Sequence, residues 1–196
     1  MKRETRLTVS TFGAIVGMAG LEHGVGEILQ GNIPTDGLVI ESWPNIEAYE
    51  ILAGEPAMTI IPNFLLSGIV TVIVSIIFIL WAVKYVERRK GGLILIIISL
   101  LLLLIGGGFG PPIMGSIIGG FGMRMNNRSE LPSGKTRLGS LWPVMYVAGM
   151  VGYFSLWPGL IVVSMFFPIE PMFTVSLTLF SFSSLILALL SSSSYS

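Results

Sequence analysis

The stretch Gly91 to Met123 reads GGLILIIISLLLLLIGGGFGPPIMGSIIGGFGM, and it decides how the chain is expected to fold. Its 33 residues exceed the roughly 20 that one membrane-spanning helix needs, but are fewer than two full helices need. Glycine and proline are the residues least compatible with a helix interior, so their concentration in the middle predicts a break. The residues of this break are Gly106, Gly107, Gly108, Gly110, Pro111 and Pro112.

The composition of the whole chain predicts a membrane protein. Hydrophobic residues make up 53% of the chain, charged residues only 11%, and the mean hydropathy is +0.84. Polar sequence is confined to short connections, so the fold class expected is an all-α integral membrane protein with a single transmembrane domain, 1–196. The absence of cysteine excludes disulfides, thiolate metal sites and a cysteine nucleophile.

Charge distribution favours one of two topologies. All eleven Lys and Arg residues fall within Lys2 to Arg6, Lys84 to Lys90 and Arg124 to Arg137. If the Gly91 to Met123 stretch turns back as a hairpin, all three groups lie on one side, which the positive-inside rule identifies as the cytoplasm. This hairpin gives a polytopic bundle with six passes and cytoplasmic termini in the plasma (inner) membrane. A single kinked crossing gives five passes and leaves the basic residues of Arg124 to Arg137 outside the cell.

The predicted passes follow the apolar runs and leave one long acidic connection outside. They cover residues 7–30, 62–83, 91–108, 111–123, 141–167 and 172–190, with the outer connection at 31–57. Within this connection a short helix is expected near Asn45 to Leu52. Trp157-Pro158 is typical of a kink or an interface anchor, and Ser191 to Ser196 is expected to be a disordered tail.

Ionisable residues at the end of the first pass are the candidate functional site. His23 and Glu27 are four residues apart, so on a helix they share a face, and the imidazole is expected to donate to the carboxylate. A stripe of glycines at Gly13, Gly17, Gly20 and Gly24 would let another helix come close and bury the pair. Glu22 is adjacent in sequence, and Glu55 of the acidic connection is expected to reach the same place.

Three interpretations of these four residues remain open. They could hydrogen-bond the connection at the level of the lipid headgroups, with no further role. His23 and Glu27 could handle a proton or cation, because histidine titrates near neutrality and carboxylates bind cations. They could also hold a metal, with His23 and Glu27 as ligands, whereas a single histidine excludes bis-histidine haem within one chain.

The leading functional prediction is binding or passage of a small solute or cation, and no cofactor is assigned. The alternative is a non-catalytic membrane subunit or assembly factor that acts through its glycine-rich helix surfaces, at Gly13 to Gly24 and Gly115 to Gly122. An enzyme ranks third, because the sequence has no recognisable nucleophile or hydrolase motif. The expected partners are the lipid bilayer and either a second copy or another membrane subunit, with no nucleic acid.

Overall fold

A computed structural model describes residues 3–44, 50, 54–126 and 137–195 of the chain. These residues are mostly helical, with eight α-helices, one π-helical turn and two short strands among them. They form two compact units, one of Val9–Asn127 and the other of Met1–Thr8 together with Arg128–Ser196.

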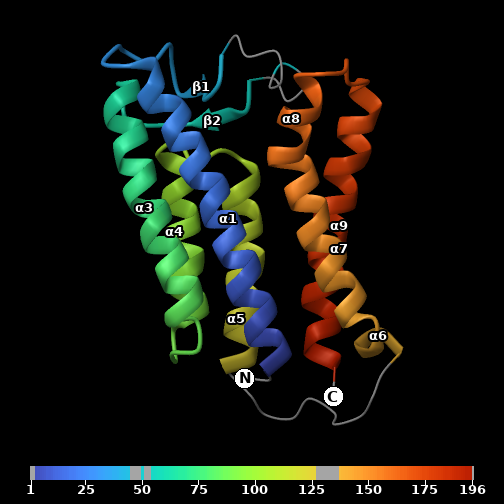
Figure 1. The fold of residues 1–196 in the computed structure, drawn as a ribbon. Helices are drawn as coiled ribbons and strands as arrows, with labels where there is room; N and C mark the ends of the chain where they lie inside the picture. Colours follow the sequence, from blue (N-terminus) through green and yellow to red (C-terminus); the bar gives the residue numbers. More distant parts are fainter. Residues whose placement is uncertain (1–2, 45–49, 51–53, 127–136, 196) are drawn as a thin grey trace. The chain divides into compact units, whose positions relative to one another are not determined.

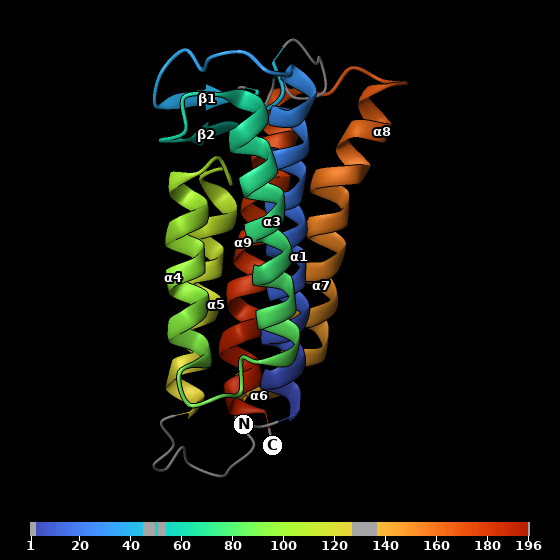
Figure 2. The same ribbon diagram turned by 90° about the vertical axis from the view of Figure 1, so that its left-hand side faces the viewer.

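The larger unit is built from four helices that run side by side (Figures 1 and 2). They are α1 (Arg3–Gln30), which belongs to this unit from Val9 onward, α3 (Phe64–Lys84), α4 (Gly91–Leu104) and α5 (Gly110–Asn126). Local sequence sets the helix ends: Gly31, with φ of +89°, follows the last residue of α1. The side chain of Asn63 caps α3 by accepting a hydrogen bond from the amide of Leu66 at 3.0 Å.

Glycines let α1 and α3 lie in close contact. A β-carbon on Gly24 would fall 2.9 Å from the carbonyl oxygen of Gly68, and one on Gly13 would fall 2.5 Å from the β-carbon of Ala82. The start of α1 therefore lies beside the end of α3, so the two helices are antiparallel. The glycine stripe thus has the close helix neighbour that its spacing predicted.

The helices on either side of the glycine-rich break also pack closely and run antiparallel. A β-carbon on Gly119 would lie 2.7 Å from the carbonyl oxygen of Gly92 at the start of α4, and Gly115 faces the hydroxyl of Ser99 further along α4. The chain therefore folds back as a hairpin, the first of the two arrangements expected from the sequence. α4 has 14 residues and spans about 21 Å, less than the ~30 Å of a bilayer's hydrocarbon core.

A two-stranded ribbon lies over one end of this unit (Figure 1). Strands β1 (Val39–Glu41) and β2 (Pro56–Met58) are antiparallel, with Ile40 opposite Ala57. These two residues form an apolar cluster with Phe64, which fastens the ribbon to the start of α3. The prediction of an all-α fold omitted this ribbon, because strands of three residues have no detectable period in the sequence.

The ribbon strand β2 and the residues after it supply hydrogen bonds to the break between α4 and α5. The carbonyl of Met58 accepts from the amide of Gly106 at 2.8 Å, and the amide of Ile60 donates to the carbonyl of Leu104 at 2.9 Å. Non-helical backbone at membrane depth requires such partners, because lipid offers none. The end of the acidic connection and the break are therefore joined by backbone hydrogen bonds.

The smaller unit contains the C-terminal helices and the first residues of α1. Its elements are α6 (Arg137–Ser140), α7 (Trp142–Phe154), the π-helical turn η1 (Ser155–Gly159), α8 (Leu160–Ser164) and α9 (Pro171–Ser194). α7 and α9 pack against each other. The turn η1 contains Trp157-Pro158, and because proline has no amide hydrogen, the regular helical hydrogen bonding cannot continue there.

Residues near both ends of the chain make contacts within this unit. The hydroxyl of Thr5 donates to the carbonyl of Ser192 at 2.9 Å, and the ring of Tyr195 lies 5.0 Å from that of Trp142. The predicted disordered tail is therefore wrong for Ser191 to Ser194, which form the last turn of α9. Serine hydroxyls can bond to carbonyls of the preceding turn, and Ser191 does so with Leu187 at 2.6 Å.

The surface of α3 has the polarity expected in lipid. Its small polar residues Ser67, Thr71 and Ser75 are fully buried, while many of its large apolar side chains face outward. The exposed ones are Leu66, Ile69, Val70, Ile73, Ile76, Ile77, Leu80 and Val83. Soluble proteins rarely expose so large an apolar surface. Phe64–Lys84 and Met172–Ser194 are also long and apolar enough to cross a membrane, so the structure indicates membrane association.

Several helix bounds differ from the predicted passes. The pass predicted at 91–108 ends as a helix at Leu104, and the next helix begins at Gly110 rather than at residue 111. Pro111 and Pro112 therefore lie in the first turn of α5, where a missing amide hydrogen costs little. The pass predicted at 141–167 is divided among α7, η1 and α8. The short helix expected near Asn45 to Leu52 lies outside the described residues, except for residue 50.

Candidate functional site

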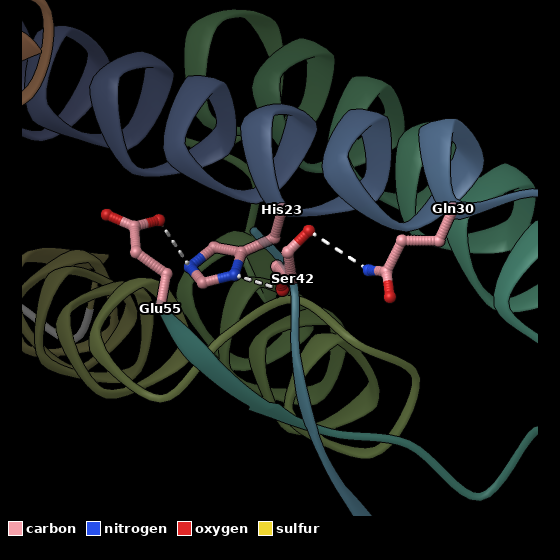
Figure 3. Close-up of polar contacts among 4 residues, drawn as sticks. All are labelled: His23, Gln30, Ser42 and Glu55. Carbon is pink, nitrogen blue, oxygen red and sulfur yellow. Dashed lines mark hydrogen bonds and ion pairs between the residues drawn. The ribbon is translucent and has the colours of Figure 1, made fainter. Parts of the chain in front are cut away.

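His23 lies between two segments of the acidic connection (Figure 3). Its Nδ1 is 2.8 Å from Oγ of Ser42, its Nε2 is 3.5 Å from Oε2 of Glu55, and its surface is only 6% exposed. Because a carboxylate only accepts, the ring hydrogen belongs on Nε2, where it faces Glu55. Nδ1 then accepts from Ser42 in the neutral ring or donates to Ser42 in the charged ring, so either protonation state has partners.

The backbone around Glu55 adopts an unusual conformation that brings this residue to His23. Its φ is +52°, a left-handed value that residues with a β-carbon rarely adopt, and it follows Gly54 at +68°. Such a conformation costs on the order of 1–3 kcal/mol and persists only where the surroundings hold it. Here the amide of Ser42 donates to the carbonyl of Glu55 at 3.2 Å, so the two segments that contact His23 also bind each other.

The helix that carries His23 also positions Ser42. Two turns further along α1, Nε2 of Gln30 donates to the carbonyl oxygen of Ser42 at 3.1 Å (Figure 3). The same nitrogen donates to the carbonyl oxygen of Glu41 at 3.0 Å. A β-carbon on Gly26 would collide with the Ser42 carbonyl, so the ribbon lies directly on the helix there. Ser42 is therefore held on α1 independently of its contact with the imidazole.

Glu27 shares a face of α1 with His23 but has different surroundings. The side chain is 0% exposed, and neither carboxylate oxygen has a hydrogen-bond partner among the described residues. Both ring nitrogens of His23 face other residues. The predicted hydrogen bond between the imidazole and the Glu27 carboxylate is therefore wrong, because Ser42 and Glu55 of the connection occupy the imidazole instead.

Glycines of the break form a wall against these two side chains. A β-carbon on Gly106 would overlap with the carboxylate of Glu27, and one on Gly108 would overlap with the imidazole of His23. Both glycines have positive φ angles, +107° and +74°. The glycine run therefore breaks the helix, as the sequence predicted, and also encloses His23 and Glu27.

Glu22 adds a second carboxylate beside His23. One ligand atom each from Glu22, His23 and Glu55 lie within 4.8 Å of one another. Glu22 and His23 are buried, and Glu55 is half-buried. One imidazole nitrogen with carboxylate oxygens suits divalent cations such as Zn²⁺, Mn²⁺ or Fe²⁺. Among the described residues, Glu22, His23 and Glu55 could thus hold a divalent ion together, whereas the sequence had pointed to His23 with Glu27.

Sequence reasoning identified the charged members of the site but missed the neutral ones. The structure brings Glu22, His23 and Glu55 together and places Glu27 against the break. Gln30 could have been found, because it is seven residues from His23 and so lies on the same face of the helix. Ser42 gave no signal, because its position depends on how the ribbon folds onto α1.

Comparison with known proteins gives no relative: no protein-family model, no curated protein and no solved structure matches this chain. Function is therefore inferred from the site itself.

Proposed function

We propose that this protein is a small multi-pass membrane protein that binds a small cation or other small solute and passes it across the membrane. The binding residues are Glu22, His23, Glu27 and Glu55. The observation that carries the proposal is the buried imidazole of His23, which lies between Ser42 and Glu55 with Glu22 close enough to share a ligand.

Electrostatics supports a positively charged ligand. Placing an ionisable residue at membrane depth costs several kcal/mol unless it is paired or used. The described structure nevertheless gathers the carboxylates of Glu22, Glu27 and Glu55 around the end of α1, where Nε2 of His23 lies 3.5 Å from Oε2 of Glu55. A bound cation offsets the repulsion between carboxylates, which a purely structural role would leave in place.

The glycine-rich helix surfaces that favoured a non-catalytic subunit are covered by other helices of the same chain. The stripe on α1 packs on α3, and the glycines of α5 pack on α4, where Gly122 lies against Val86 and Gly92. A partner would therefore have to bind elsewhere. This arrangement favours a role for the polar cluster over one for the glycine stripes.

The proposed topology has six passes in the plasma membrane, with α4 and α5 as the hairpin and both termini in the cytoplasm. In the larger unit, the basic turn Lys84 to Lys90 and the basic end of α5 at Arg124 share one end, whereas Asp36 and Glu55 are at the other. The positive-inside rule assigns the basic end to the cytoplasm. The polar cluster then lies toward the outer face.

Native mass spectrometry with elemental analysis tests the proposal on gently purified full-length protein. Wild type is compared with the His23→Ala, Glu27→Ala double variant and with Glu41→Ala, which removes an exposed carboxylate from the same ribbon. We expect a bound metal or small solute in wild type and Glu41→Ala that the double variant lacks. The same three proteins in proteoliposomes should differ in the flux of that species.

Equal occupancy of the three proteins would contradict the proposal, provided that circular dichroism shows the double variant to be folded. If the double variant is unfolded, Ser42→Ala replaces it, because it changes only the group facing Nδ1 of His23. Unchanged binding and flux in Ser42→Ala and in the conservative variant Glu55→Gln would likewise count against the proposal.

A further inference from the structure

The carboxyl of Glu27 offers chemistry that the His23 cluster does not use. Its side chain is fully buried, and both oxygens lack a hydrogen-bond partner among the described residues. Ser67 lies beside this carboxyl, but its hydroxyl hydrogen is used elsewhere, since Ser67 donates to the carbonyl of Ile105 at 2.9 Å. An ionised carboxylate without donors is costly to bury, so the charge of this group must be neutralised, either by a proton or by a bound cation.

Two further hydroxyls lie around Ser67, and their hydrogens are used in other contacts. Thr71 donates to the same Ile105 carbonyl, and Oγ1 of Thr59 lies 2.8 Å from Oγ of Ser67. Because Ser67 donates to Ile105, Thr59 is the donor in the second contact. Thr59, Ser67 and Thr71 are all buried, so the hydroxyl of Ser67 next to Glu27 belongs to a buried cluster of oxygen atoms.

We propose that Glu27, together with the hydroxyl oxygens around Ser67, binds a monovalent cation of the sodium class. This inference rests on the proposed function, because it names the cation that the end of α1 binds. Small, hard cations prefer oxygen ligands, whereas nitrogen ligands such as His23 favour transition metals. A single carboxylate balances a single positive charge, which selects a monovalent ion over Ca²⁺ or Mg²⁺.

Gly106 adds a reason for the position of this site in the fold. A side chain at this residue would occupy the space next to the Glu27 oxygens, since even a β-carbon would overlap with the carboxylate. The break thus leaves the carboxyl facing backbone rather than an apolar side chain. Backbone and hydroxyl oxygens are the usual neutral ligands of hard cations, so the glycine places the carboxyl beside groups of this class.

Thermal unfolding of the full-length protein in detergent tests the site with Na⁺ as the probe. NaCl replaces choline chloride at constant ionic strength and pH, for wild type, Glu27→Gln and the control Glu41→Gln. An ion that binds only the folded state raises the Tm progressively once its concentration exceeds the Kd. We expect a Na⁺-dependent rise in Tm for wild type and Glu41→Gln, and its loss in Glu27→Gln.

A wild-type Tm that does not respond to Na⁺ would overturn the sodium site, and an infrared band of a protonated carboxylic acid that disappears in Glu27→Gln would then identify a proton as the bound charge. An undiminished Na⁺ response in Glu27→Gln would overturn the site as well. If that variant does not fold, binding of radioactive sodium to wild type and Ser67→Ala decides: we expect weaker binding in Ser67→Ala, and no binding to wild type overturns the site.

Binding of Mn²⁺ to the same preparations separates this inference from the proposed function. Mn²⁺ that binds to wild type and is lost in His23→Ala, with no response to Na⁺, would leave the proposed function standing and overturn the sodium site. A Na⁺ response that depends on Glu27 supports the inference whether or not Mn²⁺ binds. Absence of both responses, with no flux in proteoliposomes, would overturn both proposals.

Discussion

Gly108 lies so close to the imidazole of His23 that a β-carbon at this position would overlap with Nε2. The contact joins the two features that the sequence presents separately, the ionisable end of the first helix and the glycine-rich break some eighty residues later. Because the φ of Gly108 is also positive, both space and backbone conformation require glycine there. Substitutions in the break should therefore alter the position of the His23 side chain at the candidate site.

The substitution Gly108→Ala should destabilise the protein and weaken ligand binding at His23. The strained backbone alone costs about 1–3 kcal/mol, and the methyl group must also displace the imidazole. Thermal unfolding and ligand occupancy measure the two effects. Gly120→Ala is the matched control, because a β-carbon on Gly120 in α5 meets no atom within 4 Å. This control should be neutral or stabilise by up to about 1 kcal/mol, and equal effects of both variants would show that the contact is absent.

Removal of the hydroxyl in Ser42→Ala should cost about 1–3 kcal/mol, because it leaves a buried ring nitrogen of His23 without its partner. In a His23→Ala background the same change should cost much less, so a double-mutant cycle gives the coupling energy. Ser116→Ala serves as the control, since its hydroxyl bonds only to the Pro112 carbonyl of its own helix. A coupling energy near zero would argue against the contact.

The crossing of α1 and α3 should not tolerate a side chain at Gly68. A β-carbon there would fall 2.5 Å from the carbonyl oxygen of Gly24 and 2.8 Å from the amide nitrogen of Ile28. Backbone atoms cannot move aside as a flexible side chain does, so Gly68→Val should destabilise by about 1–3 kcal/mol or more. Gly120→Val is the control for the lower helix propensity of valine. Similar Tm values for the two variants would mean that the helices do not approach closely.

Much of the helical framework could be predicted from the sequence, because long apolar runs and glycine spacing are local signals. The break at Gly106 to Pro112 and the close packing at Gly13 to Gly24 both follow from the properties of glycine and proline. The ribbon could not be predicted, since its strands are three residues long and depend on contacts with Phe64. The last turn of α9 was also missed, because its serines have weak helix propensity and the contact from Thr5 is distant in sequence.

The site was predictable only in its charged members, because burial of ionisable residues in an apolar stretch is itself a signal. The pairing of these residues was not predictable. Spacing along α1 suggested that His23 would bind Glu27, but the left-handed conformation of Glu55 and the fold of the ribbon give the imidazole other partners. Contacts between segments far apart in the sequence decide which of several nearby carboxylates histidine meets.

Cysteine labelling tests the hairpin and with it the number of passes. The chain has no cysteine, so single substitutions at Asp36, Lys90 and Arg124 each give one thiol for a membrane-impermeant reagent. Because α4 and α5 are antiparallel, Lys90 before α4 and Arg124 near the end of α5 lie at the same end of the unit, and Asp36 lies at the other. We therefore expect Asp36→Cys to react from outside intact cells, and Lys90→Cys and Arg124→Cys only after permeabilisation. Labelling of Arg124→Cys from outside, with Lys90→Cys protected, would mean that the chain crosses once between them and has five passes.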